Sequence, residues 1–279
     1  MSRSRATHVP AIVMTKDSYR PFTANMIASY EELWPGHPLE FFVPYQQDRS
    51  IGSKTGRSRI KFIKTAPGFH DTVLTLLEGL RGDDWVYFCI DDKFPTWVNV
   101  PLMSGVFDRV LSGVDNPPEV AGLAFTRSRA AVSWPGISLE ERVGFGVRAY
   151  QRRSMTTFWF HRLVRVQVLL DFFTTLPPVS SAKEMDFYSR QFKYDAVFLT
   201  TRSHALSLSE STSRGRVTAS ALKSLQTRQI DVGSSFLETG VADVGDMEPT
   251  GMKDHAKIKL HDLSSALVSR KFWPGARRF

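Results

Sequence analysis

The chain is expected to adopt an α/β fold, with a Rossmann-like, mostly parallel sheet and flanking helices. Two observations predict it. Apolar runs of strand length alternate with segments of helical periodicity through residues 9–90. The strand-length runs are apolar almost throughout rather than alternating with polar residues, which is typical of parallel strands covered on both faces.

The first third of the chain has the clearest pattern. Short apolar runs predict strands at residues 9–14, 39–45 and 85–90, and the alternating segment 59–64 suggests another strand. Apolar residues at helical spacing predict helices over 22–34 and 70–81, which end at Pro35-Gly36 and Gly82. Ligands of parallel sheets bind at the carboxyl ends of strands, near a switch in strand order. We therefore expect a site around residues 15–19 and 91–92.

The rest of the chain is predicted to continue this alternation. The expected elements are a helix over 102–111, a strand over 120–125, a long helix over about 148–173, and a polar helix within 180–202 followed by a strand at 195–201. Ser- and Thr-rich sequence follows to residue 220. We expect one domain over residues 1–232 and a C-terminal loop with a basic, aromatic tail over residues 233–279.

Composition limits the class of protein. Lys and Arg number 36 against 28 Asp and Glu, a net charge of +8 that favours anionic partners such as phosphates, nucleic acid or an anionic membrane surface; a solvated basic face is the simpler interpretation. The one cysteine, Cys89, excludes an internal disulfide framework and a zinc site built on several thiolates. The sequence has neither a membrane-spanning apolar run nor a signal peptide, so we expect a cytoplasmic protein.

The carboxylates Asp91 and Asp92 follow the strand predicted at 85–90. Acids that emerge from a buried strand must be solvated, paired or bound to a cation, because an unpaired buried charge is costly. A nucleotide-diphosphate donor needs its leaving group neutralised, and Mn²⁺ or Mg²⁺ on carboxylate oxygens does this. Two loop acids that cap the next element are the alternative interpretation.

Residues 84–94 read Asp-Trp-Val-Tyr-Phe-Cys-Ile-Asp-Asp-Lys-Phe. This segment resembles the aspartate motif of small bacterial-type GT-A glycosyltransferases. Residues 11–19 and 30–39 resemble the family's start, where a strand and loop hold the nucleotide base. An aromatic-rich segment at 150–163 resembles the family segment that precedes an acidic motif, and 214–225 resembles its basic-Gly-basic ending. The resemblance covers roughly residues 9–232.

The resemblance implies a GT-A-like fold and a nucleotide-sugar-dependent, hexosyltransferase-like enzyme of bacterial or viral glycan and polysaccharide biosynthesis. It implies that Asp92 binds the metal or diphosphate and that Asp91 faces the ribose or sugar. The family's metal motif has an acid where this chain has Ile90, so metal dependence stays open. The acceptor hydroxyl needs a general base, and Glu184 or Asp186 is the candidate, with a solvated acid at a helix start as the alternative.

Further donor-site candidates lie elsewhere in the sequence, before and after the acid pair. By resemblance, Thr15, Asp17 and Tyr19 would line the nucleotide pocket. Arg57 and Arg59, in a Gly- and Ser-rich stretch, have guanidinium groups suited to phosphate, although a mobile surface loop is the more common reading of such a segment. Arg214, beside Gly215, has the same two interpretations. The sequence has no Gly-x-Ser-x-Gly elbow and no Gly-x-Gly-x-x-Gly fingerprint.

The expected reaction is transfer of a sugar from a nucleotide diphosphate to a hydroxyl of a glycan or lipid-linked glycan. The basic, aromatic tail is compatible with peripheral contact with an anionic membrane. One alternative is a non-catalytic protein that binds nucleic acid or another anionic ligand, but the aromatic residues fall inside apolar runs, so nucleic acid is not expected. The other alternative is a different nucleotide-dependent α/β transferase.

Overall fold

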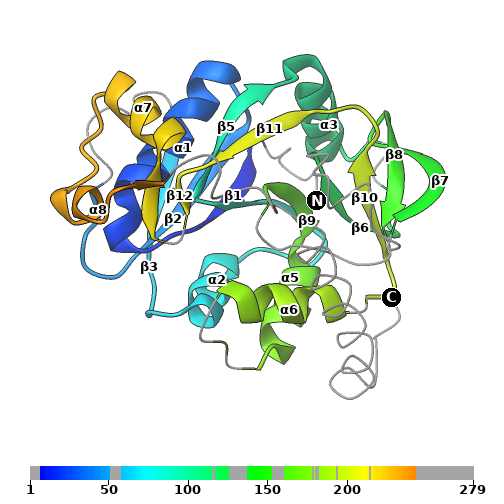
Figure 1. Cartoon of the computed structure of the whole chain (residues 1–279). Helices are drawn as coiled ribbons and strands as arrows, with labels where there is room; N and C mark the ends of the chain where they lie inside the picture. The colour runs from blue at the N-terminus through cyan, green and yellow to red at the C-terminus, as the bar shows by residue number, and fades with distance from the viewer. Residues whose placement is uncertain are drawn as a thin grey trace, which may run out of the picture.

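The computed structural model describes residues 7–50, 58–114, 117–125, 137–152, 160–177, 179, 182–192, 194–213 and 215–242. A nine-stranded mixed sheet with strand order β3-β2-β1-β4-β9-β6-β10-β8-β7 lies at their centre (Figure 1). Its strands are β1 (Val9–Met14), β2 (Leu39–Tyr45), β3 (Arg59–Lys64), β4 (Trp85–Ile90), β6 (Val120–Ala124), β7 (Ile137–Gly144), β8 (Val147–Arg152), β9 (Arg162–Arg165) and β10 (Val197–Thr201).

Strand direction divides the sheet into blocks. Strands β3, β2, β1 and β4 are mutually parallel. Strand β9 inserts antiparallel between β4 and β6, β10 runs parallel to β6, and β8 pairs antiparallel with β10 and β7. The sheet is therefore largely parallel, and its strand order reverses between β1 and β4, which is where a doubly wound sheet places its ligand.

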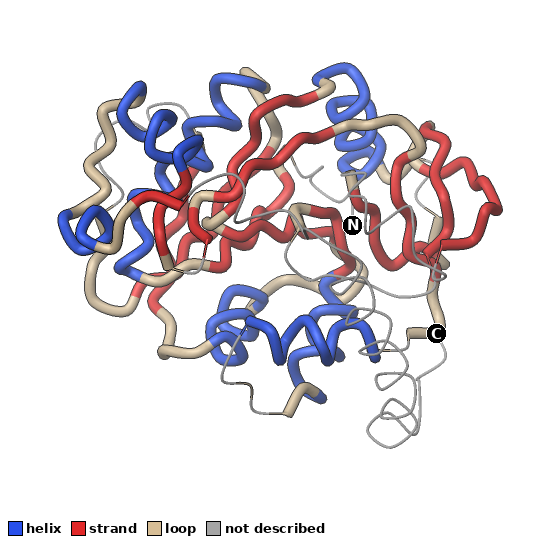
Figure 2. Tube along the Cα trace, viewed as in Figure 1, coloured by secondary structure: helices blue, strands red, loops and turns tan. Residues whose placement is uncertain are grey.

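Helices cover both faces of the sheet, as Figure 2 shows. One face packs against α1 (Arg20–Leu33), α3 (Val100–Ser112) and α7 (Ala219–Thr227), and the other against α2 (Phe69–Leu77), α5 (Val166–Thr175) and α6 (Ala182–Gln191). Strand β1 serves both cores, because Ala11 and Val13 face the first set of helices while Ile12 and Met14 face the second. Covering on both faces explains why these strands are apolar throughout.

A second, two-stranded sheet lies beside the central one. It pairs β5 (Lys93–Val98) antiparallel with β11 (Leu206–Glu210), and Figure 1 shows the two strands side by side. Three short strands form a third sheet: β12 (Thr212–Ser213), β13 (Arg216–Thr218) and β14 (Val241–Ala242). The remaining elements are the 3-10 helix η1 (Asp17–Tyr19) and α8 (Ser234–Glu238).

Local chemistry sets several of the helix ends. The Asn99 side chain accepts a hydrogen bond from the Leu102 N–H at the start of α3, and Gly113 ends that helix at a left-handed φ of 71°. The Thr218 side chain accepts from the Ala221 N–H and begins α7 in the same way. Of the helices in the described part of the chain, none is both long and apolar enough to cross a membrane.

The α/β class and the early elements are confirmed, but the long helix expected over about 148–173 is wrong. That stretch contains β8, β9 and only then α5. Strand β9 exists because β4 and β6 pair with it on either side, which helical spacing of apolar residues does not reveal. The packed structure also continues past the expected boundary at residue 232, since β14 pairs with β13. Residues 243–279 lie outside the described ranges.

Candidate functional site

The site lies at the carboxyl ends of β1 and β4, on either side of the reversal in strand order. Thr15 and Lys16 follow β1, and Asp91 and Asp92 follow β4. The two ends stay adjacent because the Asp91 N–H donates to the Met14 carbonyl at 3.2 Å. The sequence-based expectation of a site at these two strand ends therefore matches a cavity in the structure.

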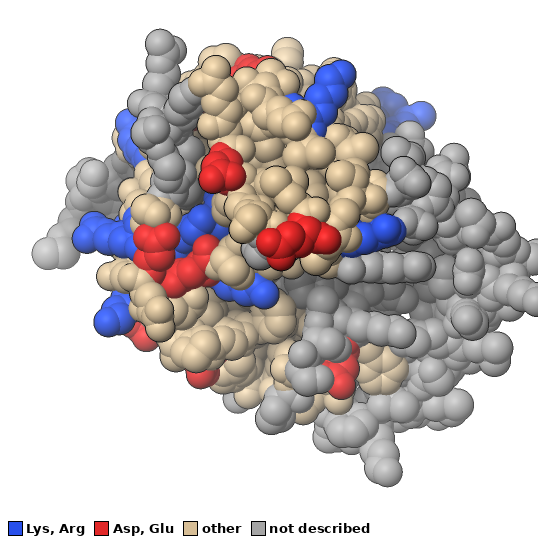
Figure 3. All heavy atoms as spheres, turned by 60° about the vertical axis from the view of Figure 1, so that its left-hand side comes forward, with Lys and Arg blue, Asp and Glu red and all other residues tan. Residues whose placement is uncertain are grey.

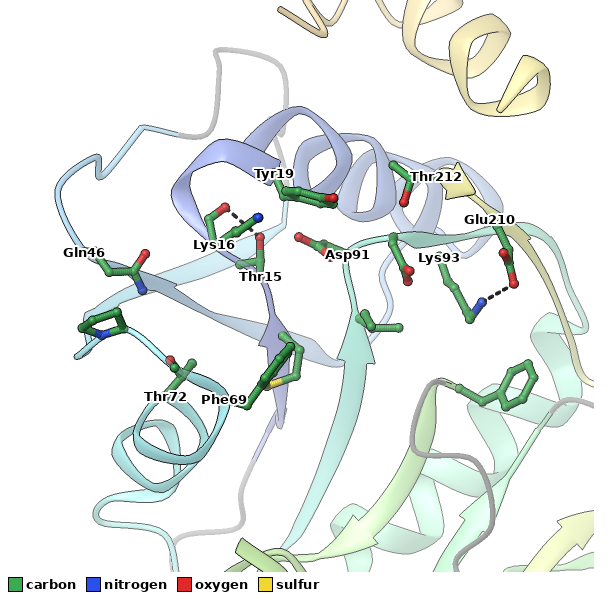
Figure 4. A pocket seen from close by; sticks show the side chains of 16 residues that line it. Thr15, Lys16, Tyr19, Gln46, Phe69, Thr72, Asp91, Lys93, Glu210 and Thr212 are labelled. Carbon is green, nitrogen blue, oxygen red and sulfur yellow. Dashed lines mark hydrogen bonds and ion pairs between the residues drawn. The ribbon is translucent and has the colours of Figure 1, made fainter. Parts of the chain in front are cut away.

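The cavity has a volume of about 760 Å³. Figure 4 shows the side chains of three of its walls, from the ends of β1 and β4, from the start of α2, and from the β5–β11 pair. Its lining residues are Met14, Thr15, Lys16, Tyr19, Gln46, Pro67, Gly68, Phe69, Thr72, Ile90, Asp91, Asp92, Lys93, Phe160, Glu210 and Thr212. Of the ten site residues expected from the sequence, Thr15, Tyr19, Asp91 and Asp92 are brought together here.

Asp91 is the most deeply placed acid of the cavity. It is 5% exposed, and its Oδ2 atom is buried without a hydrogen-bond partner among the described residues. Burial raises the pKa of Asp91 well above its usual value, and the charge of Asp92 adds to the rise, while a hydrogen bond from Thr15 opposes it. An unpartnered buried carboxylate oxygen is unfavourable in the free protein, which is typical of a group arranged to meet a ligand.

Asp92 also has a buried oxygen without a described partner, and the cation of Lys93 lies nearby. Its Oδ1 is also buried without a partner among the described residues. Burial raises the pKa of Asp92, Glu210 raises it further, and Lys93 lowers it. The main chain at this position is fixed, because the Asp92 carbonyl accepts a hydrogen bond from the Ser211 N–H. Two adjacent acids thus each present an unsatisfied oxygen at one cavity.

Lys93 and Glu210 form the ion pair at the β5–β11 end of the cavity. They are register partners in the antiparallel pair, and the Lys93 Nζ lies 2.6 Å from Glu210 Oε1. The Lys93 side chain is 9% exposed and also lies 5.6 Å from the centre of the Phe160 ring. Sequence analysis overlooked both residues, although Lys93 directly follows the acid pair. Glu210 ends a short Leu-Ser-Leu-Ser-Glu alternation that signals a strand.

Lys16 provides the other cation of the cavity. Its Nζ lies 4.6 Å from the centre of the Tyr19 ring, and no described carboxylate pairs with it. Figure 4 shows the ammonium group near Thr15, on the side that faces Asp91. The Tyr19 pKa is raised by burial and by the charges of Asp91 and Asp92, so its hydroxyl also lies near the acids. Like Lys93 and Glu210, Lys16 was not expected at the site from the sequence.

A buried polar chain supports the end of β4 from behind. The His161 Nε2 lies 3.1 Å from the Ile90 carbonyl, which can only accept, so Nε2 carries the proton and Nδ1 accepts from the Tyr30 hydroxyl at 2.6 Å. The Tyr30 oxygen in turn lies 2.8 Å from the Tyr87 hydroxyl. Burial lowers the pKa of His161 to about 3, which keeps the ring neutral. This series of hydrogen bonds ends at the Ile90 carbonyl, one residue before Asp91.

Asp17 acts beside the cavity rather than in its lining. Its carboxylate accepts hydrogen bonds from the successive N–H groups of Gln46, Gln47 and Asp48, and it pairs with Arg20 at 2.9 Å. Gln46, which lines the cavity, is therefore held in place by Asp17. The expectation that Asp17 lines the nucleotide pocket is corrected to this indirect position, because its oxygens are occupied by the β2–β3 loop.

The structure brings neither Arg59 nor Glu184 to the cavity. Arg59 lies at the amino end of β3, the opposite edge of the sheet, where it contacts His8. Glu184 is exposed in the first turn of α6, a helix that packs on the α2 face and contributes no lining residue. Asp186 is on the same helix. Arg57 and Arg214 lie outside the described residues.

The acids of the cavity meet only part of what a divalent cation needs. Among the described residues, no group of three or more His, Cys, Asp and Glu side chains is arranged to hold a metal ion. Mg²⁺, however, is commonly held by one or two carboxylates together with substrate phosphates. The unpartnered oxygens of Asp91 and Asp92 fit that narrower requirement. Asp92 remains the residue proposed for metal binding, with the diphosphate as the source of further oxygens.

No protein-family model matches the sequence, and no curated protein matches it. Among solved structures, matches include S. aureus TarS 1-349 (TM-score 0.44, 11% identity, 94% of this chain and 80% of that chain) and LgtC in complex with donor and acceptor sugar analogs (0.37, 12%, 80% and 80%). A third is 4-diphosphocytidyl-2C-methyl-D-erythritolsynthase from Anaerococcus prevotii DSM 20548 (0.39, 8%, 80% and 99%).

The chain spans 36% of the length of another TarS structure that it matches. With identities this low and TM-scores below 0.5, these matches identify neither an activity nor a substrate for this chain.

Proposed function

We propose that the chain is a nucleotide-sugar-dependent glycosyltransferase that binds its donor in the cavity between β1 and β4. One observation carries the proposal: Asp91 and Asp92 each hold a buried oxygen without a described partner at the switch point of the sheet. Lys16, a cation without a described carboxylate partner, lies beside them. Acids and a cation at such a place suit a ligand that brings both phosphate and hydroxyl groups.

The donor would lie across the two strand ends. Thr15, Tyr19 and Gln46 form the wall suited to the nucleoside, and Phe69 adds an aromatic surface at the start of α2. Lys16 would bind the phosphates, because an ammonium group neutralises phosphate charge. Asp91 would accept hydrogen bonds from ribose or sugar hydroxyls. A divalent cation held by Asp92 and Asp91 would neutralise the departing diphosphate.

The acceptor proposed is a hydroxyl of a glycan or a lipid-linked glycan, in a cytoplasmic protein with peripheral membrane contact through residues 233–279. Direct binding of nucleic acid is not part of the proposal. On the face in Figure 3, described Lys and Arg side chains are interspersed with Asp and Glu rather than gathered into one stripe. A nucleic-acid groove is typically a continuous basic surface with exposed aromatic residues.

The test is a calorimetric and thermal-shift panel of UDP, GDP, TDP and CMP, each with and without Mn²⁺. One nucleoside diphosphate is expected to bind wild type, and a ligand at a hundred times its Kd raises unfolding free energy by about 2.7 kcal/mol. Lys16→Ala should weaken the diphosphate about tenfold, the equivalent of about 1.4 kcal/mol, and leave the parent nucleoside unchanged. Lys64→Ala, which removes an exposed cation at the end of β3, is the matched control.

Asp92→Ala should fold, because the Asp92 carboxylate is not needed for packing. The variant should lose the Mn²⁺-dependent part of nucleotide binding, because it lacks the proposed metal ligand. Absence of binding by any nucleotide to a folded wild type contradicts the proposal. Selective binding of a nucleoside triphosphate would instead favour another nucleotide-dependent α/β transferase. Binding of nucleic acid that falls steeply with salt would favour the non-catalytic alternative.

A further inference from the structure

Glu210 is held at the cavity by its main chain as well as by its side chain. The Glu210 carbonyl accepts a hydrogen bond from Thr218 Oγ1 at 2.6 Å, and the next residue, Ser211, donates its N–H to the Asp92 carbonyl. The strand pairing places Lys93 directly opposite. An acid that is far from Asp92 in the sequence is therefore fixed next to it, and the charge of Glu210 raises the pKa of Asp92.

The three acids that line the cavity differ in what they can do. Asp91 is 5% exposed, and Asp91 and Asp92 each hold one buried oxygen. The Glu210 side chain is 45% exposed. Its Oε1 contacts Lys93, and its second oxygen has no hydrogen-bond partner among the described residues. Glu210 therefore combines a lining position with a partly exposed side chain and one oxygen that no described residue occupies.

We propose that Glu210 is the general base that accepts the proton of the acceptor hydroxyl in a single-displacement, inverting transfer. The inference rests on the proposed glycosyltransferase function and replaces Glu184 and Asp186 as the base. The acceptor oxygen forms a bond to the anomeric carbon of the donor while its proton passes to the free oxygen of Glu210. The bond from that carbon to the phosphate oxygen breaks, and its electron pair leaves with the diphosphate. The protonated Glu210 then returns its proton to solvent.

Lys93 is a positioning residue in this scheme. Its ammonium is largely enclosed, at 9% side-chain exposure, and it contacts Glu210 at 2.6 Å and the Phe160 ring at 5.6 Å. By contacting Oε1, it fixes the position of the carboxylate, whose other oxygen has no described partner. The base lines the same cavity as the unpartnered oxygens of Asp91 and Asp92.

The test compares Glu210→Gln with Glu184→Gln in the full chain. The amide keeps the size of the side chain and an oxygen that can accept from Lys93, so folding and nucleotide binding should be preserved. With the nucleotide sugar whose diphosphate binds wild type, and water as acceptor, nucleotide release by Glu210→Gln should fall by about 100-fold or more. Its calorimetric Kd for the nucleotide should stay at the wild-type value. Glu184→Gln should match wild type in both measurements.

A further readout separates a base from a structural role. Azide needs no deprotonation to attack, so it should restore turnover of Glu210→Ala and give a glycosyl azide of inverted configuration. Wild-type release by Glu210→Gln, failure of azide to rescue a folded, nucleotide-binding Glu210→Ala, or a product of retained configuration would overturn the inference. A wild type that binds no nucleotide contradicts the underlying function instead.

Discussion

Tyr30→Phe removes a single oxygen from the polar chain behind β4. In wild type the Tyr87 hydroxyl donates to the Tyr30 oxygen and the Tyr30 hydroxyl donates to His161, so the variant breaks two hydrogen bonds at once. All three side chains are 0% exposed, and water cannot replace the lost group without entering the core. The ring itself keeps its packing against Phe41 and His161.

The size of the effect follows from counting these bonds. Each net hydrogen bond contributes about 1 kcal/mol, and a buried group left without a partner costs about 1–3 kcal/mol, so Tyr30→Phe should lower the free energy of unfolding by about 2–4 kcal/mol. At about 2–4 °C per kcal/mol for large domains, the melting temperature should fall by about 4–16 °C. Because burial lowers the His161 pKa to about 3, the loss should be the same from pH 5 to pH 9.

The assay is urea unfolding followed by tryptophan fluorescence, with Tyr45→Phe as the matched control. The Tyr45 hydroxyl makes no described hydrogen bond, and its removal should change stability by less than about 0.5 kcal/mol. The double variant with Tyr87→Phe should be less destabilised than the sum of the single variants, because both remove the same bond. A Tyr30→Phe midpoint equal to that of Tyr45→Phe would refute the hydrogen-bond reasoning.

Two other perturbations follow from the site. Asp91→Asn should raise the stability of the ligand-free protein above about pH 4. Burial raises the pKa of Asp91, so ionisation of this carboxyl destabilises the folded wild type as pH rises. In melting curves measured against pH, the stability gain of the variant should vanish below 3.8, the pKa of Asp91 in the unfolded chain. The reasoning would be contradicted if the stability difference between Asp91→Asn and wild type were no larger at pH 8 than at pH 3.5. Asp17→Ala frees the N–H groups of Gln46, Gln47 and Asp48 and should weaken the nucleotide about tenfold by calorimetry, the equivalent of about 1.4 kcal/mol. An unchanged Kd would show that the loop needs no such anchor.

The sequence was informative where each element carries its own signal. Strands β1, β2 and β4 are apolar runs, β3 alternates, and the helices between them have apolar residues at helical spacing, so their positions follow from the local sequence pattern. The acids after β4 could likewise be placed at a sheet edge, because parallel strands end together. The location of the site was therefore predictable from residues 9–92.

Other features depend on partners that are distant in the sequence. Strand β9 is stabilised by its pairing with β4 and β6, and its four residues alone favour no particular conformation. Glu210 reaches the cavity through its pairing with Lys93, across 117 residues of chain. Glu184, an acid in a motif-like segment, lies on α6, a helix that packs with α2 and α5 against one face of the sheet. The residues next to a single acid in the sequence do not indicate on which surface of the fold its side chain will lie.

Cys89, the only cysteine of the chain, is completely buried in the middle of β4. Burial raises the pKa of its thiol well above the usual value, which disfavours the reactive thiolate. Burial also keeps reagents away from the thiol while β4 stays paired with its neighbouring strands. The native chain thus contains a built-in reporter whose alkylation requires β4 to separate from its neighbours. The alkylation rate of this thiol measures how often the strand that carries Asp91 and Asp92 opens, and a ligand that bridges β1 and β4 would register as a slowing of that rate.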